Sequence, residues 1–343
     1  MESRLSVVYW VARAGIPAAG RTPLAVRHAL ASTVTSASYL GWRSKRHVTQ
    51  ENFARVMSLP VSDPRVKRAA LASWSNYGRT AASLICLPYL DMADVDARTV
   101  DLTEGMTWQE SLRVALAPGR GTIITTGHFG SWDLAGAIAA RHVPLSAIVD
   151  TFDDSRLDSL LQGHRRDRGV HSIPVSQAVR RGMQELTQGR ALAIVIDRPV
   201  KRGVEVTFFG HQTHVPSGAA VLAVNTGAAI TPGYMWYAAG NRFHLRAFPP
   251  VFPRSVSDRA ERKEEIRRLT QYMISCQEEI VRSCPTQWFM FRRFWFAGDD
   301  VSSGIPAGSA RPLTDGFACR LPVSPNHAPR RVDKPTPGAL GNV

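Results

Sequence analysis

The chain has 343 residues, 44% of them hydrophobic, which is enough for one large core or possibly two. Its formal net charge of +14 says nothing about the fold but restricts the partners to those that tolerate a basic surface, among them nucleic acid, anionic lipid headgroups and phosphorylated cofactors. A basic surface kept for solubility is also compatible. The cysteines form no C-x-x-C pair, so the sequence predicts no zinc site.

The amino-terminal segment is basic and partly apolar. Residues 1–50 contain seven Lys or Arg and one acid, a net charge of +6. Neither apolar cluster, at 5–12 or 31–42, reaches the roughly 18–20 uninterrupted apolar residues that span a bilayer, and no cleavage site follows, so we expect neither a transmembrane helix nor a signal peptide. We predict that residues 1–45 form amphipathic helices that dock on an anionic membrane surface. Core helices with an Arg-rich outer face are an equal alternative.

The next segment, up to about residue 100, is expected to be helical. Asp63 followed by Pro64 places an N-cap before a first-turn proline, which predicts a helix over about 64–87. Thr49 similarly precedes a stretch in which Phe53, Val56 and Met57 have helical spacing, so we expect a helix to begin there.

From about residue 105, strands and helices alternate. Thr107 and Glu110 form a capping box. Alternating elements predict an α/β fold, with a central mostly parallel sheet flanked by helices. The domain at 46–300 follows the docking segment, and 301–343 is expected to be a disordered Pro-rich tail. Expected strands lie at 121–126, 144–150, 191–197, 203–209, 227–237 and 242–248, the last two paired, and expected helices at 131–141, 176–189 and 258–283.

The candidate catalytic residue is His128, between Gly127 and Gly130 where a strand ends and a helix begins. Ligands of open α/β sheets bind at such carboxyl ends. If His128 lies in the loop and Asp133 in the first helical turn, the carboxylate fixes the imidazole tautomer and leaves the second ring nitrogen to accept a proton from a hydroxyl. By spacing alone, structural roles for both residues are the simpler interpretation.

Four motifs occur in a recognisable order. They are "ENFARVM", "GHFGSWD", "IDRPVKRGVEVTFFG" and "PTQWFMFRRFW". Together they resemble the bacterial lipid A biosynthesis acyltransferase family, which includes mycobacterial phosphatidylinositol mannoside acyltransferases. The resemblance covers roughly residues 40–297.

This resemblance implies a peripheral enzyme on the cytoplasmic face of the inner (plasma) membrane. It would move a fatty acyl chain from acyl-CoA or acyl carrier protein to a glycolipid hydroxyl, with a phosphatidylinositol mannoside-like acceptor favoured and no cofactor or metal. His128 would be the general base, and its carboxylate partner Asp133 or Glu205. Substrate-binding residues would come from Arg165, which is favoured, and from Arg166, Arg168, Asp197, Arg198, Arg292 and Arg293.

The residues suit this chemistry without the family name. A positioned base accelerates attack by a hydroxyl by about 10²–10⁴-fold, and the absence of a G-x-S-x-G motif favours direct transfer over an acyl-enzyme. An apolar groove for the chain, unless these residues are plain core, would be lined by Phe129, Trp132, Phe208, Phe209, Trp236 and Trp288.

Other functions remain open. Within the family, a lipid A precursor or a lysophospholipid is an alternative acceptor. A basic nucleic-acid-binding protein would account for the charge, but no recognition motif is present. A metal-dependent phosphodiesterase using His128, Asp133 and Asp197 would need more clustered ligands. A non-catalytic membrane-surface protein is the remaining alternative.

Overall fold

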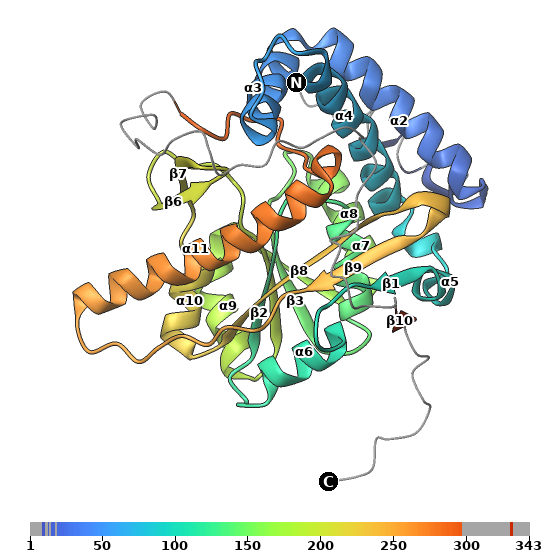
Figure 1. Cartoon of the computed structure of the whole chain (residues 1–343). Helices are drawn as coiled ribbons and strands as arrows, with labels where there is room; N and C mark the ends of the chain where they lie inside the picture. Colours follow the sequence, from blue (N-terminus) through green and yellow to red (C-terminus); the bar gives the residue numbers. More distant parts are fainter. Residues whose placement is uncertain (1–8, 11–12, 14, 18, 297–329, 332–343) are drawn as a thin grey trace.

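The structure, a computed structural model, describes residues 9–10, 13, 15–17, 19–296 and 330–331. Its centre is an eight-stranded sheet in the order β10-β1-β9-β8-β2-β5-β3-β4 (Figure 1). All neighbouring pairs in it are parallel except β8–β9 and β1–β10. The predicted α/β class is therefore correct. Its strands are β1 (Thr99–Asp101), β2 (Thr122–Thr126), β3 (Leu145–Val149), β4 (Val170–Pro174), β5 (Ala191–Val195), β8 (Ala229–Tyr237), β9 (Phe243–Ala247) and β10 (Arg330–Arg331).

Helices cover both faces of this sheet because each strand directs apolar side chains alternately to one face and to the other. One face packs against α9, α10 and α11, and includes Ile123, Leu192 and Ile230. The other packs against α6 and α7, and includes Ile124 beside Leu134 of α7. The helices that follow α4 are α5 (Met92–Ala97), α6 (Trp108–Leu116), α7 (Trp132–Ala139), α8 (Ser155–Arg166), α9 (Ala178–Thr187), α10 (Gly218–Thr226) and α11 (Arg259–Ser283).

Several sequence predictions of local structure are confirmed. The capping box of Thr107 and Glu110 is formed at the start of α6, and Asp63 accepts a hydrogen bond from the Arg65 backbone amide at the start of α4 (Pro64–Ile85). The Thr49 prediction is wrong. The helix α3 (Arg43–Met57) begins six residues earlier, and Thr49 is fully buried inside it, where its hydroxyl accepts a bond from the Trp74 indole.

The strand expected at 203–209 lies outside the central sheet. It is β6 (Val204–Phe208), paired with β7 (His211–Val215) in a two-stranded antiparallel hairpin. Only one face of this hairpin is buried, since Val206 and Phe208 point into the core while Glu205 is exposed. The hairpin lies beside α11, away from the strands of the central sheet (Figure 1).

The amino-terminal helices pack on the α/β unit. Helix α2 (Leu24–Gly41) lies along α4 so closely that a Cβ atom on Gly78 would approach the Ala31 carbonyl oxygen to 2.5 Å. The predicted docking segment, residues 1–45, is described only in part, and its boundary at residue 45 falls inside α3. No helix of the part described has both the length and the hydropathy to cross a membrane. The predicted tail at 301–343 lies outside the described residues apart from β10.

A carboxy-terminal segment, residues 284–296, ties the helices to the sheet. It includes a single 3-10 turn at Pro285–Gln287. Ser73 of α4 donates to the Trp288 carbonyl at 2.6 Å. The buried side chain of Asn52 donates to the carbonyls of Met290 and Arg292, and accepts from the Phe294 amide. The motifs at 51–57 and 285–295 are therefore parts of one contact.

Removing the Asn52 amide should destabilise the protein, because three backbone groups would lose their buried partner. We expect Asn52→Ala to lower the free energy of unfolding by about 2–4 kcal/mol, measured by urea denaturation. The control is Gln188→Ala, at an exposed position, for which we expect a change within about 0.5 kcal/mol. Equal stability of the two variants would show that Asn52 does not hold the segment.

Candidate active site

The site forms where two adjacent parallel strands end. Strand β2 pairs with β5 so that Thr126 is opposite Val195. Two residues beyond these ends are His128 and Asp197, which the register brings side by side. The Nδ1 atom of His128 is 2.7 Å from Oδ1 of Asp197. The His128 side chain is 40% exposed whereas that of Asp197 is fully buried, so the ring faces the surface and its partner lies beneath it.

Five hydrogen bonds hold the Asp197 carboxylate. Besides the ring Nδ1, the backbone amide of His128 lies 3.0 Å from each carboxylate oxygen. Gln277 of α11 donates to Oδ2 at 2.6 Å, and the Trp288 indole donates to the same oxygen at 3.1 Å. An ionised carboxylate only accepts, so the neutral ring carries its proton on Nδ1 and leaves Nε2 as a free acceptor.

Glycines flank His128 because other chain segments approach the loop closely. A Cβ atom at Gly127 would lie 2.3 Å from Nε2 of Gln277, and one at Gly130 would lie 2.0 Å from the Met235 carbonyl oxygen. Gly130 also has a φ of +60°, in the left-handed region that favours glycine. The first glycine therefore admits the amide that binds Asp197, and the second allows the turn into α7.

The two charges of the pair stabilise each other. Burial lowers the pKa of His128, but the charge of Asp197 and its hydrogen bond outweigh burial and raise that pKa above its usual value of 6.5. The charges of Arg292 and Arg198 oppose this increase, which places both guanidinium groups near the ring. Burial raises the pKa of Asp197, but the His128 charge and its hydrogen bonds lower it on balance.

The predicted contact partners of His128 are wrong. Asp133, in the first turn of α7, accepts a 2.7 Å bond from Nε of Arg165 on α8, and both side chains are largely buried. Glu205 is exposed on the hairpin strand β6. Asp197, predicted as a substrate-binding residue, is the carboxylate that contacts the ring.

The predicted arginines fall into two groups. Arg165 and Arg168 are tied to the protein: Arg168 donates to the carbonyls of Leu87, Pro88 and Leu90, whereas Arg166 is exposed. Arg198, Arg292 and Arg293 are exposed, with Arg198 paired to Asp150 and Arg293 to Glu51. Arg198 and Arg292 of the second group supply positive charge that acts on His128.

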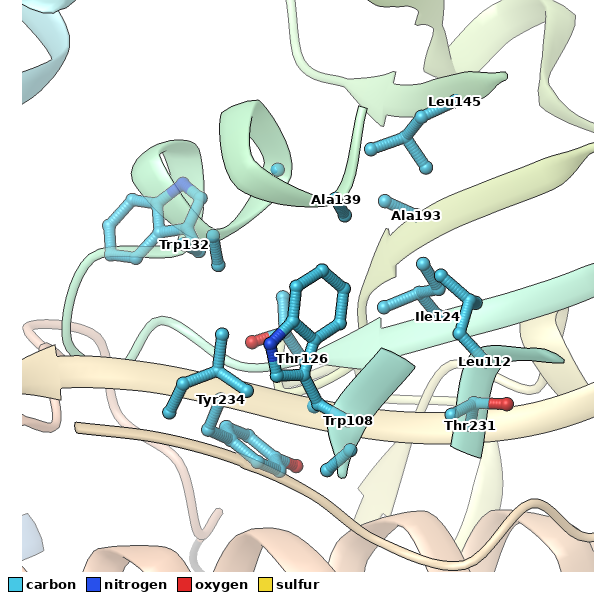
Figure 2. A pocket seen from close by; sticks show the side chains of 15 residues that line it. Trp108, Leu112, Ile124, Thr126, Trp132, Ala139, Leu145, Ala193, Thr231 and Tyr234 are labelled. Carbon is cyan, nitrogen blue, oxygen red and sulfur yellow. The ribbon is translucent and has the colours of Figure 1, made fainter. Parts of the chain in front are cut away.

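An apolar cavity lies next to Trp132, a ring neighbour of the histidine. The Trp132 ring meets the His128 ring edge-on, 5.7 Å between centroids, and also lines the cavity. The cavity lies between the sheet and helices α6 and α7, with Trp108, Leu112, Ile124 and Leu145 on its walls (Figure 2). Its empty volume, which includes open solvent, is about 650 Å³.

Only one of the aromatic residues predicted for an apolar groove lines this cavity. Trp132 does, but Phe129, Phe208, Trp236 and Trp288 have at most 1% of their surface exposed and belong to the core on the opposite face of the sheet. Phe209 also lies in that core. Apart from Trp108, Trp132 and Tyr234, most of the wall is aliphatic or small, a pattern that sequence periodicity alone does not distinguish from ordinary core.

Titration of His128 tests the electrostatics of the pair. We expect the native ring to titrate above pH 6.5 in an NMR pH series, and Asp197→Asn to move that pKa downward because the stabilising charge is lost. His142 is the internal control, since burial lowers its pKa and it should not respond. An unchanged His128 pKa in Asp197→Asn would contradict the coupling.

Comparisons with known proteins show which family the chain belongs to. Residues 2–296 match the family described as bacterial lipid A biosynthesis acyltransferase. The chain is 28% identical over 298 residues to a phosphatidylinositol mannoside acyltransferase of Mycobacterium tuberculosis (strain H37Rv), covering 84% of this chain and 88% of the relative. It is 26% identical over 313 residues to the protein of that name from Mycolicibacterium smegmatis, covering 87% and 95%.

Among solved structures, the chain resembles the 1-acyl-sn-glycerophosphate (LPA) acyltransferase PlsC from Thermotoga maritima. The sequence identity is 13%, the TM-score is 0.33, and the match covers 72% of this chain and 97% of that one. A TM-score this low carries no argument about the site. The family match spans most of the chain, including the His128 loop, the Asp197 strand end and the Trp288 segment, and the chain therefore belongs to the bacterial lipid A biosynthesis acyltransferase family, whose members are acyltransferases.

Proposed function

We propose that this acyltransferase moves a fatty acyl chain from a thioester to a hydroxyl of a phosphatidylinositol mannoside-like glycolipid, with His128 as the general base. The observation that carries the proposal is the partly exposed, Asp197-bound imidazole in contact with Trp132, which lines an apolar cavity. The acceptor class follows from the names of the relatives, which are 26–28% identical over most of this chain.

The base works through its free nitrogen. Nε2 of His128 takes the proton of the attacking hydroxyl while Nδ1–H remains bonded to Asp197, whose negative charge stabilises the imidazolium that forms. The hydroxyl oxygen then attacks the thioester carbonyl carbon. Collapse of the tetrahedral intermediate breaks the carbon–sulfur bond, and the imidazolium returns its proton to the leaving thiolate. Ester and free thiol are the products.

Positive groups near the ring suit the charge that develops. The tetrahedral intermediate carries an oxyanion, which donors or cations stabilise. Helix α7 begins four residues after His128, and its N-terminal dipole end is positive. Arg198 and Arg292 add full charges near the ring. These arginines also suit the phosphates of an acyl-CoA donor or an acidic carrier protein, and the choice between these donors is part of the test below.

Membrane association is the second part of the proposal. The outward face of α2 carries Val26, Leu30 and Val34 at four-residue spacing, each 46–66% exposed. From residue 29 to residue 42 the sequence has no charged side chain, which is unusual for a solvent-facing helix. Basic residues flank this stretch at Arg27 and Arg43. We propose that this face enters the headgroup boundary of an anionic leaflet at the cytoplasmic side of the membrane.

Replacing the base should stop transfer. We expect His128→Ala to reduce turnover by about 10²–10⁴-fold, measured by mass spectrometry of glycolipid products from the purified protein with acyl-CoA, and separately with acyl carrier protein. The acceptors are a phosphatidylinositol mannoside and a lipid A precursor. Retained turnover in His128→Ala would refute the assignment of the base.

Matched carboxamide variants identify the partner of the base. Asp197→Asn should lower turnover strongly and move the acidic limb of the kcat/KM profile to lower pH, because the base then stays neutral to a lower pH. Glu205→Gln, at an exposed strand position, should leave that limb in place. A shift in Glu205→Gln without one in Asp197→Asn would reverse the assignment.

Charges placed on α2 should weaken vesicle binding. We expect the double variant Leu30→Glu and Val34→Glu to lower co-sedimentation with vesicles of phosphatidylglycerol and phosphatidylcholine by at least tenfold, since two apolar side chains of roughly 1.5–3 kcal/mol each no longer enter the lipid. Deleting residues 1–45 is a poorer test because α2 packs against α4.

The matched control for vesicle binding is Val114→Glu. Val114 is 47% exposed on α6, at the opposite end of the molecule from α2 (Figure 1). We expect the Val114→Glu and His128→Ala variants to bind vesicles as the native protein does. Equal binding of the α2 double variant and the Val114→Glu control would contradict docking through α2.

A further inference from the structure

The cavity between the sheet and helices α6 and α7 runs from Trp132 to Leu145, and different side chains line it at each level. Three partly exposed residues of its wall, Ile124, Ala193 and Gly233, sit in the middle of the central sheet. Residues at such positions are normally fully buried in a parallel sheet. Their exposure marks unfilled space within the apolar interior.

The strand register orders the wall from the histidine inward. Gly233 follows Pro232, which is opposite Thr125, so Gly233 lies level with Thr126 near the Trp132 end. Ala193 is opposite Ile124, two residues deeper. Leu145 is opposite Ala191, and therefore level with Thr122. From the level of Thr126 to that of Leu145 the cavity descends about 13 Å, at roughly 3.3 Å per residue.

The end of the cavity away from Trp132, called the deep end here, is lined by small side chains and one leucine. Ala139, Ala193 and Leu145 lie together there, on the side of the cavity away from Trp132 (Figure 2). Ala139 is seven residues along α7 from Trp132, which is about 10 Å of helix. A larger side chain at Ala193 would occupy space that is now empty, without moving Trp132 or the histidine.

Near the Trp132 end, Gly233 leaves a gap of its own. The single heavy atom within 4 Å of a Cβ atom added there is Cγ2 of Ile124, at 3.9 Å, which is an ordinary van der Waals contact. Its φ does not lie in the left-handed region. A side chain at Gly233 is therefore compatible with the backbone and would project into the passage that connects Trp132 with the deep end.

We infer that the side chains at positions 233, 193 and 145 determine how long an acyl chain the enzyme accepts, with 233 setting the width of the entrance and 193 and 145 the depth. This inference rests on the proposed function. A chain that extends from a thioester at His128 into the cavity meets these positions in that order. Each methylene denied an apolar surface loses about 0.8 kcal/mol of transfer free energy, which is about fourfold in affinity.

The experiment measures kcat/KM for a series of saturated acyl-CoA donors from four to eighteen carbons, with the native protein and three variants. Ala193→Leu should shift the optimal donor to a shorter chain. It should lower kcat/KM for the longest donors by at least tenfold and leave kcat/KM for the shortest donor unchanged. Gly233→Val should lower kcat/KM for every donor except the shortest. Leu145→Val should improve the longest donors, because it removes a methylene at the deep end.

The matched control is Ala147→Val. Ala147 is opposite Ala193 on the neighbouring strand β3 and is partly buried, but it does not line the cavity. Its donor profile should equal the native one. Ala193→Val is a smaller change at the same position. If either Ala193 variant keeps the native melting temperature, a changed donor profile in that variant is not caused by unfolding.

The outcomes separate the two claims. Transfer by Ala193→Leu with the native chain-length profile would overturn the role of position 193 while leaving the acyltransferase proposal intact. If Ala193→Leu and Gly233→Val both kept the native chain-length limit, the inference that the cavity wall determines acyl chain length would be wrong as a whole. Failure of the native protein to transfer any donor to any acceptor would instead refute the proposed function.

Discussion

The structure depends on one buried carboxylate. A charge with no exposed surface, such as that of Asp197, is costly unless hydrogen bonds replace its water. Here the replacement comes from the His128 loop, from α11 through Gln277 and from the carboxy-terminal segment through Trp288. Removing any one donor leaves part of the charge unsatisfied, so these three parts of the chain must be assembled together. A positioned imidazole is a consequence of that assembly.

The same carboxylate explains why the last motif stands so far from the histidine in sequence. Backbone bonds from the Phe289 amide to the His128 carbonyl and from the Gly130 amide to the Gln287 carbonyl fix the loop against the segment that carries Trp288. That segment is held in turn by Asn52 and Ser73 from α3 and α4. The amino-terminal helices therefore support the site through hydrogen bonds to the main chain, in addition to the role in membrane contact that we propose for the outer face of α2.

The two faces of the central sheet are packed differently. One face packs densely against α9, α10 and α11, with Phe129, Phe208 and Trp288 of the family motifs in its core. The other leaves a cavity beneath α6 and α7, where small residues stand opposite aliphatic ones. A dense face keeps the strand ends in register, which is necessary for residues 128 and 197 to meet. A hollow face provides apolar space beside the same strand ends, where an alkyl chain loses contact with water.

Local sequence determined many of the elements and the candidate base. The capping box at Thr107, the cap at Asp63 and the alternating apolar strands each depend on residues close together in the chain, and the position of His128 after a strand follows from the glycines around it. Strand order was decided only by the tertiary structure. Strand β5 is adjacent to β2 although β3 and β4 come between them in sequence, and no local pattern specifies that neighbour. For this reason the sequence offered Asp133, five residues away, or Glu205 as the partner, whereas the folded sheet pairs His128 with Asp197, 69 residues away. The cavity was likewise decided by packing, because small residues such as Ala193 and Gly233 have the same periodicity whether a helix fills the space above them or leaves it open.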